Sequence, residues 1–159
     1  MKSIPTSSQT VGPFFSIGLA TLCQKSASEA SGTTITLSGK ILDGDLHPIP
    51  DALLEFWTGD KFTRVATLED GSYSAVLEMS LANNATAFFD VLIFMRGLLK
   101  PVYTRIYFCD LASVKNNPEL KAVPADRIET LFAHKTIAPN RYSWDVVMQG
   151  ESETVFFHF

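Results

Sequence analysis

Apolar and polar residues alternate along most of the chain after residue 32, which is the pattern of short β-strands. From Ile35 to Ile41 every second residue would share one face, and Asp70-Gly71 is a strong hairpin signal. The pattern predicts strands over 33–43, 51–58, 62–68, 72–78, 88–95, 102–109, 141–149 and 154–159. We therefore predict an all-β fold, an antiparallel β-sandwich, as one domain over residues 33–159.

Two segments depart from the strand pattern. Residues 1–32 are rich in Ser, Thr, Gly and Ala and carry an apolar block at 14–17, so we expect an extended N-terminal arm. This arm must lie against something apolar, either its own body or a partner. Pro118 and Pro124 stand at plausible first helical positions, and apolar residues at helical spacing follow over 128–132, which predicts one short helix.

The run 51–58 carries apolar residues on both faces. Leu54 and Phe56 share one face, whereas Leu53 and Trp57 share the other. A strand with two apolar faces is covered twice, by its own core and by something else.

Composition and charge narrow the classes of function. The 159 residues are 46% hydrophobic and 19% charged, with a net charge of −4, which fits a folded domain that needs neither disulfide nor metal. An excess of acids without a basic run argues against nucleic-acid binding, and no apolar run approaches the roughly 20 residues that span a bilayer. The segment 11–22 resembles the apolar part of a secretory signal, but Gly12-Pro13 interrupts it. We interpret it as mature chain, with secretion as a minor alternative.

Cysteine usage indicates the compartment. Cys23 and Cys109 have no metal-binding spacing, so we interpret them as ordinary buried thiols of a cytoplasmic protein.

Residue pattern alone reveals no active site. His47, His134 and His158 are scattered singly, and we interpret them as a turn residue, a cation that closes the helix, and a residue at a strand end. Asp90 interrupts an apolar strand and needs a partner, for which Arg105 on a neighbouring strand is a candidate. A structural pair is favoured there over a functional acid.

Arg96 ends an apolar strand. It is either a solvated strand end or a positioned cation, and the pattern alone favours the solvated end. The carboxylates Glu151 and Glu153 flank a turn and are expected to face solvent.

Several stretches match one family in order along the chain: TSSQTVGPF (6–14), FMRG (94–97) followed by TRIYF (104–108), QGESETVFF (149–157) and, more weakly, LEFW (54–57). They resemble the α chains of protocatechuate 3,4-dioxygenases, which belong to the intradiol ring-cleavage dioxygenases. The resemblance implies a β-sandwich subunit that acts in the degradation of aromatic compounds. Together with a β chain it would cleave protocatechuate with O2 between the two hydroxyl-bearing carbons, giving 3-carboxy-cis,cis-muconate.

The resemblance also implies where the cofactor lies. In this family two tyrosinates and two histidines of the β chain hold Fe(III), and the histidines form a His-x-His pair. That pair corresponds here to Phe88 and Asp90, and the loop that carries the first tyrosine is shortened to 59–61. The expectation is therefore a chain without metal, beside a partner β subunit whose cofactor is Fe(III).

The resemblance implies that this chain completes the substrate cleft at the subunit interface. The cleft and partner-facing residues would be Thr10, Gly12, Pro13 and Arg96, and no catalytic residue would lie in this chain. A cation at the rim of a cleft attracts an anionic benzoate. Tyr103 stands where the family usually has histidine, and the chain is shorter than is usual for the family, with losses after Trp57 and before Phe88.

Two alternatives differ in class from this interpretation. One is a metal-free sandwich that binds or scaffolds and has no catalytic partner. The other is a stand-alone iron dioxygenase, against which the missing ligands argue.

Overall fold

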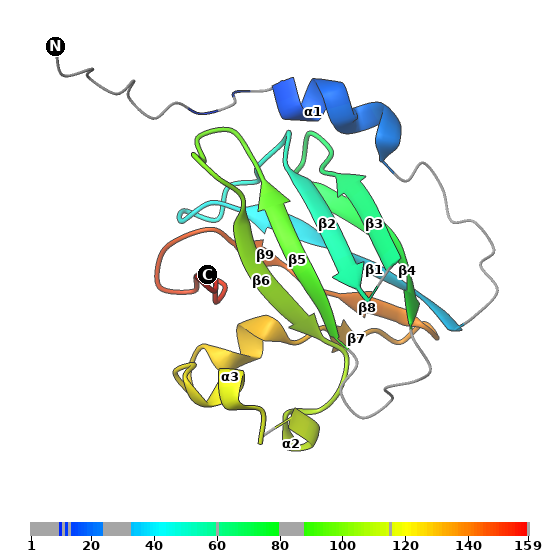
Figure 1. Cartoon of the computed structure of the whole chain (residues 1–159), viewed down its shortest axis with the longest axis vertical. Helices are drawn as coiled ribbons and strands as arrows, with labels where there is room; N and C mark the ends of the chain where they lie inside the picture. Colours follow the sequence, from blue (N-terminus) through cyan, green and yellow to red (C-terminus); the bar gives the residue numbers. More distant parts are fainter. Residues whose placement is uncertain are drawn as a thin grey trace, which may run out of the picture.

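Two β-sheets packed face to face form the body of the protein in a computed structural model (Figure 1). The structure describes Thr10, Gly12 and residues 14–23, 33–59, 61–79, 88–114 and 116–158. The strands are β1 (Thr33–Leu42), β2 (Leu53–Thr58), β3 (Lys61–Ala66), β4 (Ser72–Met79), β5 (Phe88–Phe94), β6 (Val102–Tyr107), β7 (His134–Lys135), β8 (Arg141–Ser143) and β9 (Val146–Val147). The predicted β-sandwich is confirmed.

The two sheets differ in strand direction. One has the order β3-β2-β5-β6, and all its neighbours are antiparallel. The other has the order β4-β1-β8-β7, with β9 also beside β1. In that sheet β1 pairs antiparallel with β4 but parallel with β8 and β9.

The strand predicted over 141–149 is divided into β8 and β9 around Trp144 and Asp145. The backbone N–H of Lys40 donates to Oδ1 of Asp145 at 2.8 Å, so a side chain takes the place of a ladder acceptor. The hydroxyl of Tyr73 donates to the carbonyl of Trp144 at 2.7 Å. Gly39 is required opposite this break, because a Cβ there would meet the Trp144 carbonyl oxygen at 1.8 Å.

The prediction of a final strand over 154–159 is wrong for the described residues. They contain only an isolated bridge between Tyr103 and Phe157. Side chains hold this tail in place of a ladder: Thr104 Oγ1 donates to the carbonyl of Val155 at 2.7 Å, and Thr154 Oγ1 accepts from the N–H of Val147 at 3.0 Å.

Inward-facing side chains of both sheets fill the main core. Its buried apolar members include Ile35, Leu37, Ile41, Leu54, Phe56, Val65, Leu77, Phe89, Val91, Ile93, Ile106 and Trp144. A second, smaller cluster lies under the short helices and comprises Tyr107, Val114, Leu120, Leu131 and Phe132.

Three short helical segments cover that second cluster: α2 (Leu111–Val114), α3 (Pro118–Lys121) and the 3-10 turn η3 (Ile128–Leu131). Asn117 caps α3, with its side chain accepting the N–H of Glu119, and Pro118 takes the first helical position as predicted. His134 does not close a helix, which corrects the prediction. Because Leu131 and Phe132 enter the second cluster, η3 ends there and His134 begins β7.

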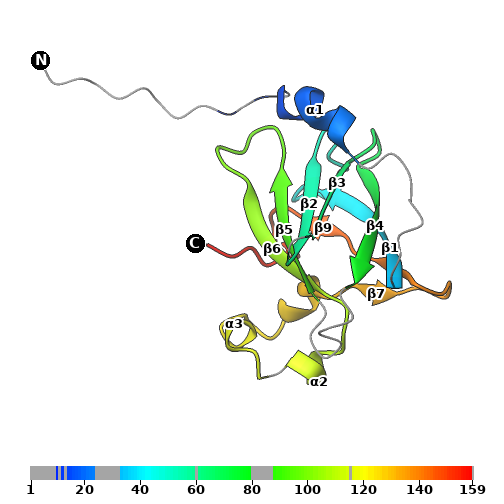
Figure 2. The ribbon, with the colours of Figure 1, turned by 45° about the vertical axis from the view of Figure 1, so that its right-hand side comes forward.

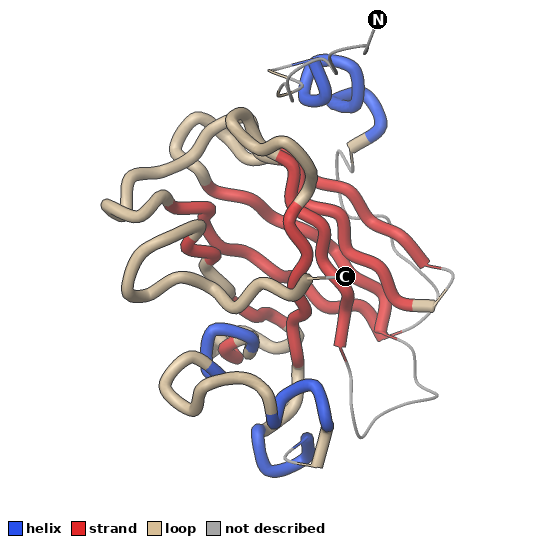
Figure 3. The backbone as a smooth tube through the Cα atoms, turned by 60° about the vertical axis from the view of Figure 1, so that its left-hand side comes forward, coloured by secondary structure: helices blue, strands red, loops and turns tan. Residues whose placement is uncertain are grey.

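The described part of the arm, which was expected to be extended, is mostly helical. It comprises α1 (Phe14–Leu19) and the 3-10 turn η1 (Ala20–Leu22). In Figures 1 and 2 this segment lies at the end of the sandwich where β5 ends and β6 begins. Figure 3 shows α2 and α3 at the opposite end. None of the helices in the described ranges is long and apolar enough to cross a membrane.

The second face of β2 is covered along only part of its length. Leu53 is fully buried and Glu55 is 6% exposed, although both point away from the main core. Trp57, on the same face, is 40% exposed. Among the described residues, the expected second cover is therefore present at the start of β2 and incomplete at Trp57 near its end.

Candidate functional site

The outer face of the β3-β2-β5-β6 sheet, the side turned away from the main core, carries alternating charged and aromatic residues. The register pairs Trp57 with Phe62 and with Asp90, and Asp90 with Arg105, so these four side chains form one row. The adjacent row consists of Arg64, Glu55, Leu92 and Tyr103. Antiparallel pairing thus brings an acid and a base side by side in each row.

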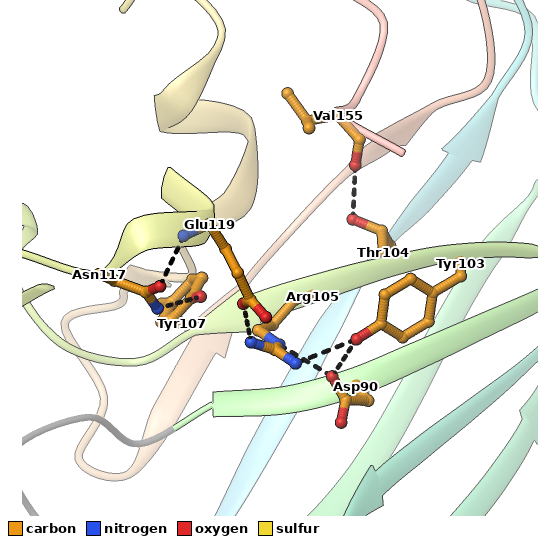
Figure 4. A network of polar contacts seen from close by, with 8 residues as sticks. All are labelled: Asp90, Tyr103, Thr104, Arg105, Tyr107, Asn117, Glu119 and Val155. Atoms are coloured by element: carbon orange, nitrogen blue, oxygen red, sulfur yellow. Dashed lines mark hydrogen bonds and ion pairs between the residues drawn. The ribbon is translucent and has the colours of Figure 1, made fainter. Parts of the chain in front are cut away.

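Arg105 is the centre of a polar network on this face (Figure 4). Its Nε donates to Oδ1 of Asp90 at 2.8 Å, and its Nη2 donates to the hydroxyl of Tyr103 at 3.1 Å. Its Nη1 forms an ion pair with Glu119, and its Cζ lies 4.1 Å from the ring centroid of Phe88. The side chain of Arg105 is 13% exposed, and it also interacts with Tyr107.

The same network fixes α3 to the sheet. Glu119 lies in the first turn of α3 and reaches Arg105, while Nδ2 of Asn117 donates to the hydroxyl of Tyr107 at 3.1 Å. The second cluster and these two polar links therefore hold the helical layer against β6.

The predicted pairing of Asp90 with Arg105 is confirmed, and the geometry is that of a structural pair. Oδ1 of Asp90 accepts both from Arg105 and from the hydroxyl of Tyr103. Burial, and then the hydrogen bond to Asp90, raise the pKa of Tyr103 to about 12 against the opposing charge of Arg105. Tyr103 is thus a neutral donor at physiological pH, and Asp90 is a paired acceptor.

The positions that the resemblance aligns with the histidine pair of the β chain do not fit iron. Phe88 offers an apolar ring stacked on Arg105, and the carboxylate of Asp90 is already engaged by two donors. Fe(III) held by tyrosinate and imidazole would need ligand atoms at these positions that are not already engaged in other contacts. Among the described residues no group of three or more His, Cys, Asp or Glu is placed to bind a metal ion.

A second ion pair, between Arg64 of β3 and Glu55 of β2, lies close to Cys23 of the arm. Arg64 Nε donates to Oε1 of Glu55 at 2.9 Å, and Trp57 Nε1 donates to Oε2 of Glu55 at 3.3 Å. Burial raises the pKa of the Cys23 thiol, which also feels the charges of Arg64 and Glu55. The end of η1 therefore lies close to this pair, and the thiol is protonated at neutral pH.

Arg96 lies in the turn between β5 and β6. The N–H of Leu98 donates to the carbonyl of Met95 at 3.4 Å, and Gly97 has a φ of +91°, which a type II turn requires at this position. The guanidinium Nη2 lies 2.9 Å from Oδ2 of Asp51, and both side chains are about half exposed. A half-exposed local ion pair is compatible with a side chain at a solvated strand end, and Arg96 keeps further N–H groups beyond this contact.

The other predicted cleft residues lie in the arm. Thr10 is exposed and Gly12 has a φ of +66°, whereas Pro13 lies outside the described residues. In the part of the chain that is described, neither Thr10 nor Gly12 forms a hydrogen bond or ion pair with Arg96. Among the described residues, Thr10 and Gly12 are therefore not joined to Arg96 by a polar contact, and their common cleft stays a prediction.

The histidines are dispersed over the surface. His47, His134 and His158 are all exposed, and Nδ1 of His47 lies 3.6 Å from Oδ2 of Asp43 in the turn that both residues share. The position of His47 fits the solvated role expected of it, whereas His158 does not lie at the end of a strand in the described residues.

Sequence reasoning missed three contributions to this region. The pattern indicates Asp51 only as the start of a strand, and it indicates neither the stacking of Phe88 on Arg105 nor the ion pair of Glu119. The contact of Asp51 with Arg96 can be found only from the strand register, because the pairing of β2 with β5 places Asp51 opposite Arg96.

Curated relatives cover almost the whole chain. The "Protocatechuate 3,4-dioxygenase alpha chain" of Burkholderia cepacia is 34% identical over 192 aligned positions, which cover 96% of this chain and 96% of the relative. The protein of the same name from Pseudomonas putida is 31% identical, covering 97% and 96%. The aligned span is longer than this 159-residue chain, so the relatives carry segments that it lacks. No family model matches the sequence.

Solved structures agree on the fold. The dioxygenase domain of a dioxygenase carbohydrate-binding protein fusion from a Streptomyces species superposes with a TM-score of 0.56 at 17% identity, covering 94% of this chain and 96% of that one. The 3-chlorocatechol 1,2-dioxygenase of Rhodococcus opacus gives 0.53 at 15% identity, covering 92% and 68%. With two relatives above 30% identity along almost their entire length, the chain belongs to the family of protocatechuate 3,4-dioxygenase alpha chains.

Proposed function

We propose that this chain is the non-iron-binding α subunit of a protocatechuate 3,4-dioxygenase. It completes the substrate cleft of a β subunit that holds Fe(III). The assembled enzyme inserts O2 into protocatechuate and opens the ring between the two hydroxyl-bearing carbons, giving 3-carboxy-cis,cis-muconate. The isolated chain is inactive in this proposal.

One observation carries the proposal: the similarity to relatives named as α chains extends over 96% of both proteins. The outer face of the sheet supports it. Where the resemblance places the metal ligands of the β chain, this chain has a network that includes Asp90, Tyr103 and Arg105. Because the charges on this face are already paired with one another, they stabilise the subunit, and in this proposal the reaction takes place at the iron of the partner.

Within this proposal, the chain contributes binding groups and no catalytic residue. Arg96 supplies a cation at the rim of the shared cleft, where it attracts and orients the carboxylate of protocatechuate. Thr10, Gly12 and Pro13 reach the cleft from the arm of residues 1–32, which extends from the sandwich of residues 33–159. Iron, bound by the partner, would bind the catecholate and promote its attack by O2.

The surrounding compartment is the cytoplasm in this proposal. The thiols of Cys23 and Cys109 are both free and partly buried, and burial raises the pKa of each. Free thiols are usual in a reducing compartment.

Association with the β subunit is the first expected result. The chain exposes several large apolar side chains in its arm and on its outer face: Phe14, Ile17, Leu22, Trp57 and Phe62. With a mean hydropathy of +0.12, a lone monomer would expose more apolar surface than soluble monomers usually do. We expect self-association of the chain alone and a defined hetero-oligomer when the β subunit is added.

Analytical ultracentrifugation of the chain with and without the β subunit measures this directly. A double substitution, Phe14→Ser with Ile17→Ser, should weaken self-association, whereas Leu68→Ser, at an exposed apolar residue of the β3–β4 turn, serves as the control. If the chain stays a compact monomer over a wide concentration range and does not bind the β subunit, the result would favour the alternative of a metal-free binding or scaffolding module.

A further inference from the structure

Asp51, whose carboxylate contacts Arg96, has an uncommon backbone conformation. Asp51 has a φ of +62°, in the left-handed region that Asp and Asn enter more readily than other non-glycine residues. Arg96 in turn precedes Gly97, whose φ of +91° makes its turn possible. Left-handed backbone therefore positions both sides of the ion pair.

The two residues face each other because of the strand register. Leu53 and Phe94 form the last pair of the β2–β5 ladder in this direction. Continuing the same antiparallel register by two residues sets Asp51 opposite Arg96, where Nη2 and Oδ2 are 2.9 Å apart. The pair thus extends two rigid central strands of the sheet, and groups on rigid elements are held more accurately than groups on free loops.

Stability gives little reason for this arrangement. Both side chains are about half exposed, so solvent screens their attraction and the pair contributes little to folding. The left-handed φ of Asp51 costs little for an aspartate, and it sets where the carboxylate lies beside Arg96. The pair therefore fixes the position of Arg96 more than it stabilises the fold.

The contact leaves Arg96 able to bind a second carboxylate. One nitrogen, Nη2, meets one oxygen of Asp51. A guanidinium has five N–H donors, so an edge remains for a paired contact with a ligand carboxylate. Asp51 can therefore fix the plane of the guanidinium while its free edge faces a ligand.

We propose that Asp51 is a positioning residue, which orients Arg96 toward the carboxylate of the aromatic substrate at the shared cleft. This inference rests on the proposed function, because it requires Arg96 to face that cleft. Asp51 acts through Arg96 and touches neither substrate nor metal.

Substitutions that preserve the backbone test the inference in the assembled α/β enzyme. Asp51→Gly removes the side chain and accepts the left-handed φ, while Asp51→Asn keeps an acceptor oxygen and removes the charge. We expect Asp51→Gly to raise the KM for protocatechuate about 3- to 10-fold with kcat within about twofold, since the ion pair that orients Arg96 is lost. Asp51→Asn should have a smaller effect. Asp45→Asn, at an exposed carboxylate of the same connection, is the control and should change nothing.

Two further measurements separate positioning from a structural role. Catechol lacks the carboxylate, so its KM should be the same in the wild-type and Asp51→Gly enzymes. In an Arg96→Met background, Asp51→Gly should have no additional effect on the KM for protocatechuate, because the two residues act as one unit.

The outcomes distinguish the inference from the function on which it rests. If Arg96→Met raises the KM and Asp51→Gly does not, Asp51 is no positioning residue, and the cleft role of Arg96 stands. If Arg96→Met leaves the KM unchanged, the cleft role of Arg96 is wrong, and the inference about Asp51 falls with it. Equal effects of Asp51→Gly on protocatechuate and catechol would likewise overturn the inference.

Discussion

Replacing Arg96 with Met in the assembled α/β enzyme is expected to raise the KM for protocatechuate by about 10- to 100-fold. A charge-assisted hydrogen bond to a charged group contributes about 1.5–3 kcal/mol, and about 1.4 kcal/mol corresponds to a tenfold change in binding. Because Arg96 would bind the carboxylate equally in the ground state and the transition state, the KM should change more than kcat. Steady-state kinetics with protocatechuate measure both constants.

Lysine provides the matched comparison at this position. Arg96→Lys keeps the positive charge but lacks the planar fork that fits a carboxylate, so it should restore only part of the affinity. The strand-end interpretation predicts a different result, in which Arg96→Met lowers stability slightly and kinetics hardly change. An Arg96→Met enzyme with full iron content and an unchanged kcat/KM would remove Arg96 from the cleft.

Replacing Arg105 with Met is expected to lower the free energy of unfolding by about 2–4 kcal/mol. The substitution leaves Asp90 and Glu119 without their shared cation and removes the stacking on Phe88. Breaking a buried ion pair from one side usually costs about 3–5 kcal/mol, and the partial exposure of both carboxylates reduces this figure. Urea unfolding followed by far-UV circular dichroism at low micromolar concentration measures the change.

Arg96→Met is the natural control for this experiment, because it removes an arginine from an ion pair that is about half exposed. Its effect on stability should stay below about 1 kcal/mol. Arg105→Lys should fall between wild type and Arg105→Met, since lysine retains the charge but loses the contacts of the fork. A loss of less than about 1 kcal/mol in Arg105→Met would show that the network around Arg105 does not hold the helical layer to the sheet.

Period-two alternation predicted the long strands well because each buries one face. β1, β4 and β5 lie within or close to their predicted ranges. The pattern failed where side chains replace ladder bonds, as at Asp145, which divides the predicted strand over 141–149. It also failed for β7, whose two exposed residues carry no hydrophobic period.

The candidate site was only partly predictable for a related reason. The pairing of Asp90 with Arg105 could be anticipated, because a carboxylate within an apolar strand needs a partner on a neighbouring strand. The pairing of Asp51 with Arg96 depends on the register of β2 against β5, which joins residues far apart in sequence. Alternation sets the face of a strand but not its neighbour, so this pair became visible only in the fold.

Oxygen consumption with protocatechuate, measured for the chain alone, the β subunit alone and their mixture, tests the central claim most directly. The account predicts no turnover and no stoichiometric iron in the lone chain, and full turnover when the two subunits are combined. The mixture should contain iron in proportion to the β subunit. Stoichiometric iron in the purified chain alone, together with the red tyrosinate-to-iron absorption and oxygen uptake, would contradict the account.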